Sequence, residues 1–402
     1  MNRFTKIFLL GIVTAALFSA FIYFEYFGIS NKLINTFFGL GAIALLLYIP
    51  KKAVLVAGFF IGLFWFYWIG YSFKYQGVGY MEPIITFSFG IIYLIFFAPL
   101  SFTDKPYIRA VLLFGLSFIE PLGWNWMKIE LLFVNSYIGV YKYQLVAVLL
   151  ALSLPALIKH KTYKFLPLLL LVFAFNYGYP KQYDAPLKIK LIQTNIPQEI
   201  KWTREALYPT IRMVYQEIQK AQNKGYDVVV FPESVFPLFM NKTPKLMQEL
   251  KKASKKITII AGALLSENNL NYNVTYMFYN GKYKVAKKLI LVPFGEYIPL
   301  PKFAQKIIND TFFQGGSDFV TAKKPTDFEI KGIKFRNAIC YEATCKELYT
   351  GDVKYMIAIS NNAWFTPSIE PTLQKLLIEY YGRKNGVTIY HAANIRGTGI
   401  IK

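Results

Sequence analysis

The sequence predicts a multi-pass α-helical membrane domain followed by a water-soluble α/β domain. Of the 402 residues, 54% are hydrophobic, more than in an ordinary soluble protein of this length. Residues 1–180 hold only 13 of the 45 lysines and arginines and 5 of the 23 acidic residues. From Lys188 onward, strand and helix patterns alternate. We therefore expect a transmembrane domain over 1–180 and a second domain over 181–402, large enough for its own core.

Seven segments of the first domain approach the length of about 20 apolar residues that spans a bilayer. With a cytoplasmic N-terminus, the inside segments carry nine lysines and arginines and the outside segments four, in agreement with the positive-inside rule. Seven crossings then place residues 181–402 outside the cytoplasm. The expected spans are 6–25, 33–49, 53–73, 83–103, 107–125, 141–158 and 163–179.

Two features of this half each allow two interpretations. The aromatic run 64–68 is expected to form an interfacial belt or to face lipid. Glu120, beside Pro121, is expected near the outer end of the fifth helix. Its carboxylate there either extends to the interface or contacts a lipid headgroup or the second domain.

The net charge of +22 next to a membrane indicates attraction to the anionic headgroups of the lipid bilayer. No motif of interleaved basic and aromatic residues is found, so nucleic acid is not expected as a partner. The two cysteines, Cys340 and Cys345, form neither a disulfide framework nor a CxxC pair. At least one is predicted to be a free thiol kept for chemistry, and we expect no metal and no cofactor.

The second domain is predicted as an α/β sandwich, because its strands are joined by helices. A hairpin is expected over 272–291, turning at Asn280-Gly281. Helices are expected over 203–224, 245–254 and 369–384, with a short one after Cys340. The other strands are expected over 188–196, 227–234, 257–265, 332–340, 353–361 and 387–394.

Three polar residues interrupt or end apolar strands. Glu233 follows VVVFP, Lys288 precedes LILVP and Cys340 follows FRNAI. The ends of buried strands open into clefts, where α/β sheets bind ligands. A thiol at a helix N-terminus beside a cation is biased toward the nucleophilic thiolate. A histidine is poorly placed to act as the general base for the cysteine, because His160 is expected in a cytoplasmic turn and His391 in a strand. A carboxylate base, Glu233, with Lys288 stabilising the oxyanion, fits better.

The motifs around these residues carry a family resemblance. FPES, KKLILVPFGEYIP and NAICYE follow one another in the order found in the nitrilase (carbon–nitrogen hydrolase) superfamily, which the second domain resembles. The resemblance implies an α/β/β/α sandwich with a triad of general base Glu233, catalytic lysine Lys288 and nucleophile Cys340. More narrowly, LVPFGEY, CYE and NNAWF behind a multi-helix membrane half resemble the apolipoprotein N-acyltransferases of the bacterial inner membrane.

The same resemblance implies four supporting or substrate-binding residues. They are Trp202, Glu296, Tyr341 and Glu342, and Glu296 is expected to orient Lys288 or share its charge. The sequence also departs from the family pattern. Asn362 replaces a common aspartate, the Asn-Thr-Gly motif is present only loosely as NIRGTG, and no arginine follows Glu120. The chain ends at Lys402, where the family usually continues to a closing transmembrane helix, so a short member or a truncated chain is expected.

The resemblance implies a ping-pong acyl transfer with the catalytic domain on the periplasmic side. Cys340 would form a thioester from a phospholipid acyl donor, and the α-amine of the N-terminal diacylglyceryl-cysteine of an apolipoprotein would accept the acyl group. The long segment 297–326 is expected to form a mobile lid that carries Phe312 and Phe313.

Two other classes of protein remain open at this point. A membrane-anchored amidase or nitrile hydrolase would use the same triad with water as second nucleophile, although a single helix would serve it as an anchor. A transporter or receptor with a degenerate domain would not need the intact triad.

Overall fold

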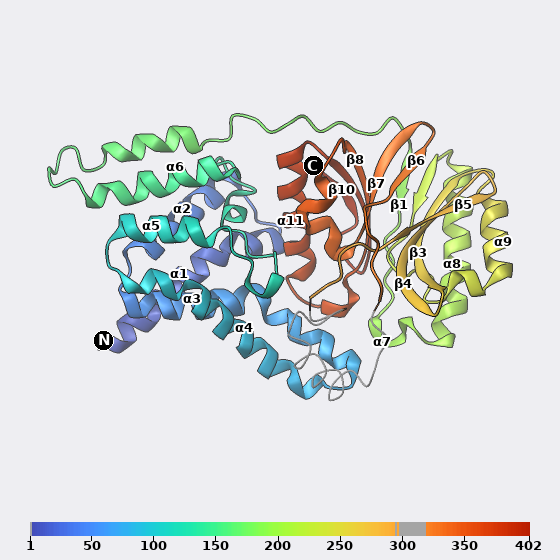
Figure 1. Ribbon diagram of the computed structural model, residues 1–402, viewed down its shortest axis with the longest axis horizontal. Coiled ribbons are helices and arrows are strands. Elements are labelled where there is room, and N and C mark those ends of the chain that lie inside the picture. Colours follow the sequence, from blue (N-terminus) through green and yellow to red (C-terminus); the bar gives the residue numbers. More distant parts are fainter. Residues whose placement is uncertain (1, 294–295, 297–318) are drawn as a thin grey trace. The chain divides into compact units, whose positions relative to one another are not determined.

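The computed structural model describes residues 2–293, 296 and 319–402, and the chain forms two compact units (Figure 1). The first comprises Met1–Lys74, Val78–Tyr179 and Pro367–Tyr380. The second comprises Tyr75–Gly77, Pro180–Thr366 and Tyr381–Lys402. Two short segments, Tyr75–Gly77 and Pro367–Tyr380, thus belong with a different unit from their sequence neighbours.

The first unit consists of helices. Within the described residues, Arg3–Tyr26, Lys51–Tyr75 and Gly79–Phe102 are long and apolar enough to cross a membrane. Three other apolar helices are shorter. The three long helices, together with the match to an integral membrane domain, confirm the predicted multi-pass helical fold. The α-helices are α1 (Arg3–Tyr26), α2 (Lys32–Tyr48), α3 (Lys51–Phe66), α4 (Glu82–Phe97), α5 (Pro106–Leu116) and α6 (Lys142–Ser153), and the longest 3₁₀ segments are η1 (Tyr67–Gln76) and η7 (Leu166–Ala174).

Two of the predicted spans differ from the structure. The fifth helix, α5, ends at Leu116 rather than at residue 125. Glu120 lies beyond its end in an extended conformation, as expected for a residue before proline, and its carboxylate is 2.5 Å from Lys128 Nζ. The seventh span forms the 3₁₀ segment η7 instead of an α-helix.

The aromatic run 64–68 was expected to face lipid or the interface, and for three of its members this expectation is wrong. Trp65, Phe66 and Trp68 are at most 1% exposed. Phe66 and Trp68 contact the ring of Trp124, with centroid distances of 6.1 and 6.3 Å. These side chains form the interior of the first unit.

Arg109 is a fully buried arginine in the first unit. Its guanidinium donates hydrogen bonds to the carbonyls of Ile49 (2.6 Å) and Leu47 (3.2 Å) at the end of α2, and to those of Leu100 (2.9 Å) and Thr103 (2.8 Å). The last carbonyls of a helix have no partner within the helix and carry partial negative charge. Arg109 therefore satisfies the end of α2 and joins it to the segment before α5.

Arg109→Met is expected to lower the free energy of unfolding by about 3 kcal/mol, because it leaves several buried carbonyls without donors. The measurement is the thermal unfolding midpoint of the full chain in detergent. The exposed Lys105→Met, four residues earlier, is the control and should change the midpoint little. Equal midpoints for the two variants would contradict this role.

The second unit contains two five-stranded sheets. The first has the order β1-β2-β3-β4-β5, in which β1 (Ile189–Leu191), β2 (Val228–Val230) and β3 (Thr258–Glu267) are parallel, and β4 (Leu270–Tyr279) and β5 (Lys282–Lys287) antiparallel. The second has the order β10-β9-β8-β7-β6, with a parallel centre. Its strands are β6 (Asp327–Ile330), β7 (Ile333–Ile339), β8 (Tyr355–Asn361), β9 (Thr388–Asn394) and β10 (Gly399–Ile401).

Most predicted elements of this unit are confirmed. The hairpin turns at Asn280-Gly281, where both residues have positive φ, as the tightest hairpin turns require. The helices are α8 (Arg204–Asn223) and α9 (Pro244–Ala253), and the third predicted helix is α11 (Glu370–Asn385), whose residues up to Tyr380 belong to the first unit. Two short edge strands, β6 and β10, were not predicted, and β1 is shorter than the expected 188–196.

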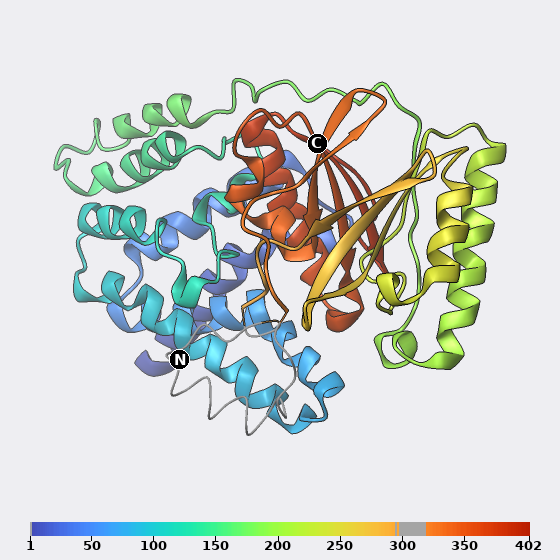
Figure 2. The same ribbon diagram turned by 45° about the vertical axis from the view of Figure 1, so that its right-hand side comes forward.

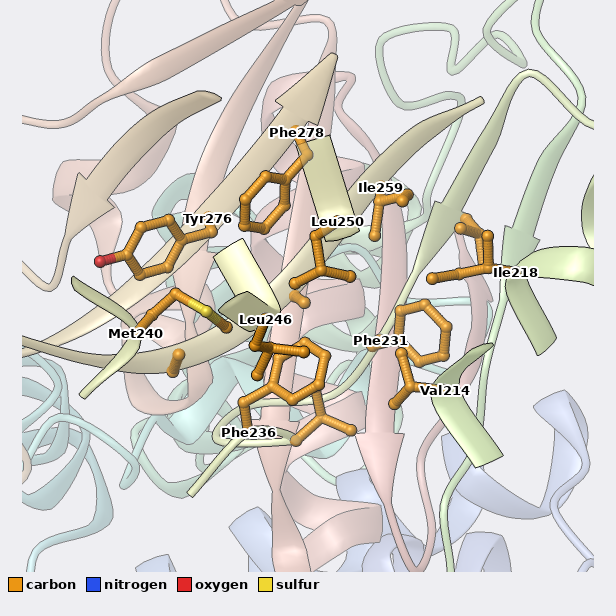
Figure 3. Packing of buried hydrophobic residues seen from close by; sticks show 14 of the residues in the cluster. Val214, Ile218, Phe231, Phe236, Met240, Leu246, Leu250, Ile259, Tyr276 and Phe278 are labelled. Atoms are coloured by element: carbon orange, nitrogen blue, oxygen red, sulfur yellow. The ribbon is translucent and has the colours of Figure 1, made fainter. Parts of the chain in front are cut away.

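Side-chain alternation along the strands builds two cores. Val229 of β2 belongs to the core between the first sheet and its helices. In this core, Val214 of α8 and Leu250 of α9 pack near Phe231, which follows β2 (Figure 3). Val228 and Val230 point to the opposite face and pack against the second sheet. The helices therefore cover the outer face of the first sheet (Figure 2), and the two sheets meet face to face, as the sandwich prediction requires.

Candidate active site

Cys340 is the first residue after β7 and begins the 3₁₀ segment η10 (Cys340–Thr344). Its φ of +57° lies in the left-handed region, which costs a non-glycine residue about 1 kcal/mol or more. Such strain persists where the surrounding structure enforces it, often at functional positions. Cys345 is buried, and its Sγ is 3.4 Å from the carbonyl oxygen of Tyr341.

Glu233 follows β2, and its backbone is tightly enclosed. Ser234 has a φ of +48°, and a Cβ on Gly262 of β3 would lie 2.7 Å from the Cα of Glu233, so only glycine fits there. The carboxylate accepts hydrogen bonds from Asn273 Nδ2 (2.7 Å) on Oε1 and from the backbone N–H of Asn361 (2.9 Å) on Oε2. The side chain is thus fixed from both sheets.

Lys288 directly follows β5 and is 1% exposed. Its Nζ lies 2.8 Å from both carboxylate oxygens of Glu296 and 3.8 Å from Glu233 Oε1. Burial alone would lower the pKa of Lys288, but the charges of Glu296, Glu233 and Cys340 raise it above its usual range. The lysine is therefore a permanent cation between two carboxylates. Its neighbour Lys287 points to the other side, where its Nζ lies 2.5 Å from Glu267.

Glu342 connects the ends of two strands. Its buried carboxylate accepts the backbone N–H of Ile339 (2.7 Å), directly before Cys340, and those of Leu289 and Ile290 (3.0 Å), directly after Lys288. Burial raises the pKa of Glu342 to about 7, against the opposing effects of Lys288 and these N–H donors. Glu342 thus holds the segments that carry Lys288 and Cys340 together.

The chain matches two family models, the apolipoprotein N-acyltransferase integral membrane domain over residues 4–177 and the carbon-nitrogen hydrolase over residues 188–401. It is 44% identical over 391 residues to an apolipoprotein N-acyltransferase of Wolinella succinogenes, covering 96% of this chain and 94% of that one. The chain belongs to the apolipoprotein N-acyltransferase family. A relative of the same name from Helicobacter hepaticus is 39% identical, covering 92% of this chain and 94% of that one.

Among solved structures, a CN-hydrolase superfamily protein from Xanthomonas campestris is 13% identical, with a TM-score of 0.40 over 52% of this chain and 76% of that one. Membership in the apolipoprotein N-acyltransferase family, together with the apolar helices of the first unit, makes the chain a bacterial membrane protein.

The structure brings Glu233, Lys288 and Glu296 together and places Glu342 between the strand ends that carry Lys288 and Cys340. Tyr341 is 3% exposed, and its carbonyl accepts a hydrogen bond from Thr344 Oγ1 (2.6 Å). Trp202, the remaining residue that the family resemblance singled out, is 46% exposed.

Two residues of the site were missed by sequence reasoning. Asn273 of β4 donates to Glu233 and also lies 3.4 Å from Glu296 Oε1. Lys201, next to Trp202, is 3% exposed, and its Nζ donates to the backbone carbonyl of Glu233 at 3.0 Å. An amide within the apolar strand YNVTYMF could have signalled Asn273, but nothing in the polar segment QEIK distinguishes Lys201.

Several other predicted features lie at the edge of this site or outside it. His391 is fully buried with Nε2 2.8 Å from Ser360 Oγ, and burial lowers its pKa to about 4. Asn362, the departure from the family pattern, donates through Nδ2 to the Arg396 carbonyl at 2.8 Å. Within the described residues, no group of three or more His, Cys, Asp or Glu side chains is placed to hold a metal. The proposed lid residues Phe312 and Phe313 lie outside the described residues.

Proposed function

We propose that this chain transfers an acyl group from a phospholipid to the α-amine of the N-terminal diacylglyceryl-cysteine of apolipoproteins, through a thioester on Cys340. The observation that carries the proposal is the arrangement at the carboxyl ends of β2 and β7. There, the buried ammonium of Lys288 lies within 3.8 Å of two carboxylates, and the segment after Lys288 is tied through Glu342 to the end of β7, directly before the strained Cys340. A base, a cation and a thiol are the groups that covalent acyl transfer needs.

In the first half-reaction, Glu233 takes the proton of the Cys340 thiol, and the sulfur attacks the ester carbonyl carbon of the phospholipid. The resulting oxyanion is stabilised by the Lys288 ammonium and by backbone N–H groups near Tyr341. When the intermediate collapses, the ester C–O bond breaks. Glu233 returns the proton to the leaving alkoxide, which departs as lysophospholipid, and the acyl group stays on the sulfur.

In the second half-reaction, the α-amine of the acceptor attacks the thioester carbonyl. Glu233 now takes the proton of the amine, and Lys288 stabilises the second oxyanion. The C–S bond breaks, the amide product leaves, and Cys340 is a thiolate again, ready to recover its proton from Glu233. Glu296, and Glu233 while it is ionised, favour the protonated form of Lys288 in both halves.

The membrane half fits this chemistry, because both substrates are anchored in a bilayer by acyl chains. The positive-inside count favours a catalytic domain on the periplasmic side of the bacterial inner membrane. A membrane-anchored amidase or nitrile hydrolase with the same triad is the alternative. It does not explain why the whole chain matches the relatives over both the membrane and the hydrolase half.

The full chain, incubated with phospholipid vesicles, is expected to gain the mass of one acyl group on Cys340 and to release one equivalent of lysophospholipid. Adding a peptide with an N-terminal diacylglyceryl-cysteine should discharge the adduct and acylate its α-amine. Peptide mass spectrometry measures both steps. If no adduct forms with phospholipid while a water-soluble amide is hydrolysed, the chain is an amidase and the proposal is wrong.

A further inference from the structure

The charged groups around Lys288 do not balance by themselves. The Lys288 ammonium lies between the carboxylates of Glu233 and Glu296, so these three groups already have a net charge of −1. Transfer of the Cys340 proton to Glu233 keeps the net charge at −1 but places a negative charge on the sulfur, and unbalanced charge in a buried site is costly. A second cation near Cys340 would reduce this charge.

Lys201 is placed to be that cation. It is the last residue of the four-residue helix α7 (Gln198–Lys201), and only 3% of it is exposed. Its Nζ donates to the backbone carbonyl of Glu233 at 3.0 Å. Its charge interacts with both Glu233 and Cys340, and these interactions favour the protonated lysine. A buried lysine without charged partners would normally be neutral.

Hydrogen bonds of Asn361 link the helix that carries Lys201 to Glu233. Gln198, at the start of α7, accepts a hydrogen bond from Asn361 Nδ2 (2.9 Å), and the backbone N–H of Asn361 binds Glu233 Oε2. Asn361 in turn accepts from Asn394 Nδ2 at 2.9 Å. The helix that carries Lys201 and the carboxylate of Glu233 are thus held by the same asparagine.

We propose that Lys201 is a second cation of the active site. It is a positioning residue, whose ammonium holds the Glu233 backbone and stabilises the negative charge of the Cys340 thiolate. No covalent step passes through it. The inference rests on the proposed role of Cys340 as nucleophile, and it explains why a lysine outside the Glu–Lys–Cys triad is buried beside it.

The test measures how fast iodoacetamide alkylates Cys340 as a function of pH, with the full chain in detergent and the label located by mass spectrometry. Lys201→Met is expected to raise the pKa of the Cys340 thiol by about one unit, so that alkylation at pH 7 falls about tenfold. Lys201→Arg keeps the charge and should stay within about threefold of the unchanged chain. Lys245→Met, an exposed lysine on α9, is the control and should behave as the unchanged chain.

A second comparison decides the matter if Lys201→Met does not fold. Burial lowers the pKa of Lys201 to about 8, against the opposing charges of Glu233 and Cys340. As the pH rises through this value, the unchanged chain should lose the cation, so its alkylation curve should show an inflection above about pH 8. The Lys201→Arg curve should lack it, because a guanidinium stays charged.

The inference is overturned if a folded Lys201→Met variant has the pH profile of the unchanged chain, or if the unchanged chain and Lys201→Arg give the same alkaline curve. It is also overturned if Lys201→Arg loses reactivity as far as Lys201→Met, because shape rather than charge would then matter. Alkylation needs no lipid substrate. A chain that forms no acyl adduct but alkylates as described would disprove the proposed function and leave this inference standing.

Discussion

Replacing Cys340 by alanine is expected to reduce acyl transfer by at least about 10⁴-fold, because the thioester can no longer form. The change should also remove the acyl adduct that phospholipid leaves on the chain. Initial rates with a phospholipid donor and a diacylglyceryl-cysteine peptide measure the first effect, and intact mass measures the second. Binding of the lipid should be little affected, because the substitution removes a single sulfur atom.

Cys345→Ala is the matched control, five residues further on. Its side chain is buried, and its Sγ is 3.4 Å from the Tyr341 carbonyl oxygen. Removing it creates a small cavity that costs about 1 kcal/mol of stability, so transfer should stay within about twofold. If the adduct disappeared in Cys345→Ala and persisted in Cys340→Ala, the assignment of the nucleophile would be wrong.

Lys288→Met is expected to lower the rate of acyl transfer by about 10³-fold. It removes an electrostatic stabiliser of both oxyanions, and loss of one such donor costs about 10²–10³-fold by itself. It also leaves the carboxylates of Glu233 and Glu296 without the ammonium between them, so that their mutual repulsion is no longer compensated. Single-turnover rates of adduct formation and of adduct discharge should both fall, because the proposed mechanism gives Lys288 a role in both halves.

Lys287→Met tests whether this effect belongs to position 288. Lys287 has the same side chain on the preceding residue, but it pairs with Glu267 on the other face of β5. Its replacement removes one partly exposed ion pair, worth about 1 kcal/mol or less, and should leave the rate unchanged. Comparable losses in the two variants would show that general lysine content, and not the charge beside Glu233, supports the reaction.

Glu233 and Cys340 could be located from the sequence because each follows a buried apolar strand, whereas β5, which precedes Lys288, is a mostly exposed strand rich in lysine. Lys287 and Lys288 are neighbours in an extended chain and therefore point to opposite faces, so only one of the two lysines can face the site. The order of the FPES, FGEY and CYE motifs selected the same residues. Glu233 and Cys340 follow strands as expected, Lys288 follows β5 instead of preceding an apolar strand, and the chemical roles of all three stay proposals.

Lys201 could not be found in this way. Its burial depends on contacts between segments far apart in the sequence, because Gln198 and Asn361 are separated by 163 residues. A four-residue helix has no apolar periodicity that would predict which side faces the site. The buried aromatic residues Trp65 and Trp68 were misplaced for a related reason, since apolar side chains suit both lipid and the interior of a helical membrane domain.

The carboxylate of Glu342 has a consequence for the timing of catalysis. Because it ties the residues after Lys288 to the residue before Cys340, the two sides of the site cannot drift apart while no substrate is bound. The conformational entropy of arranging them is lost when the chain folds, and it does not have to be lost again at each turnover. In the proposed reaction, a site preorganised in this way would bind an ester and then an amine without rearranging between them.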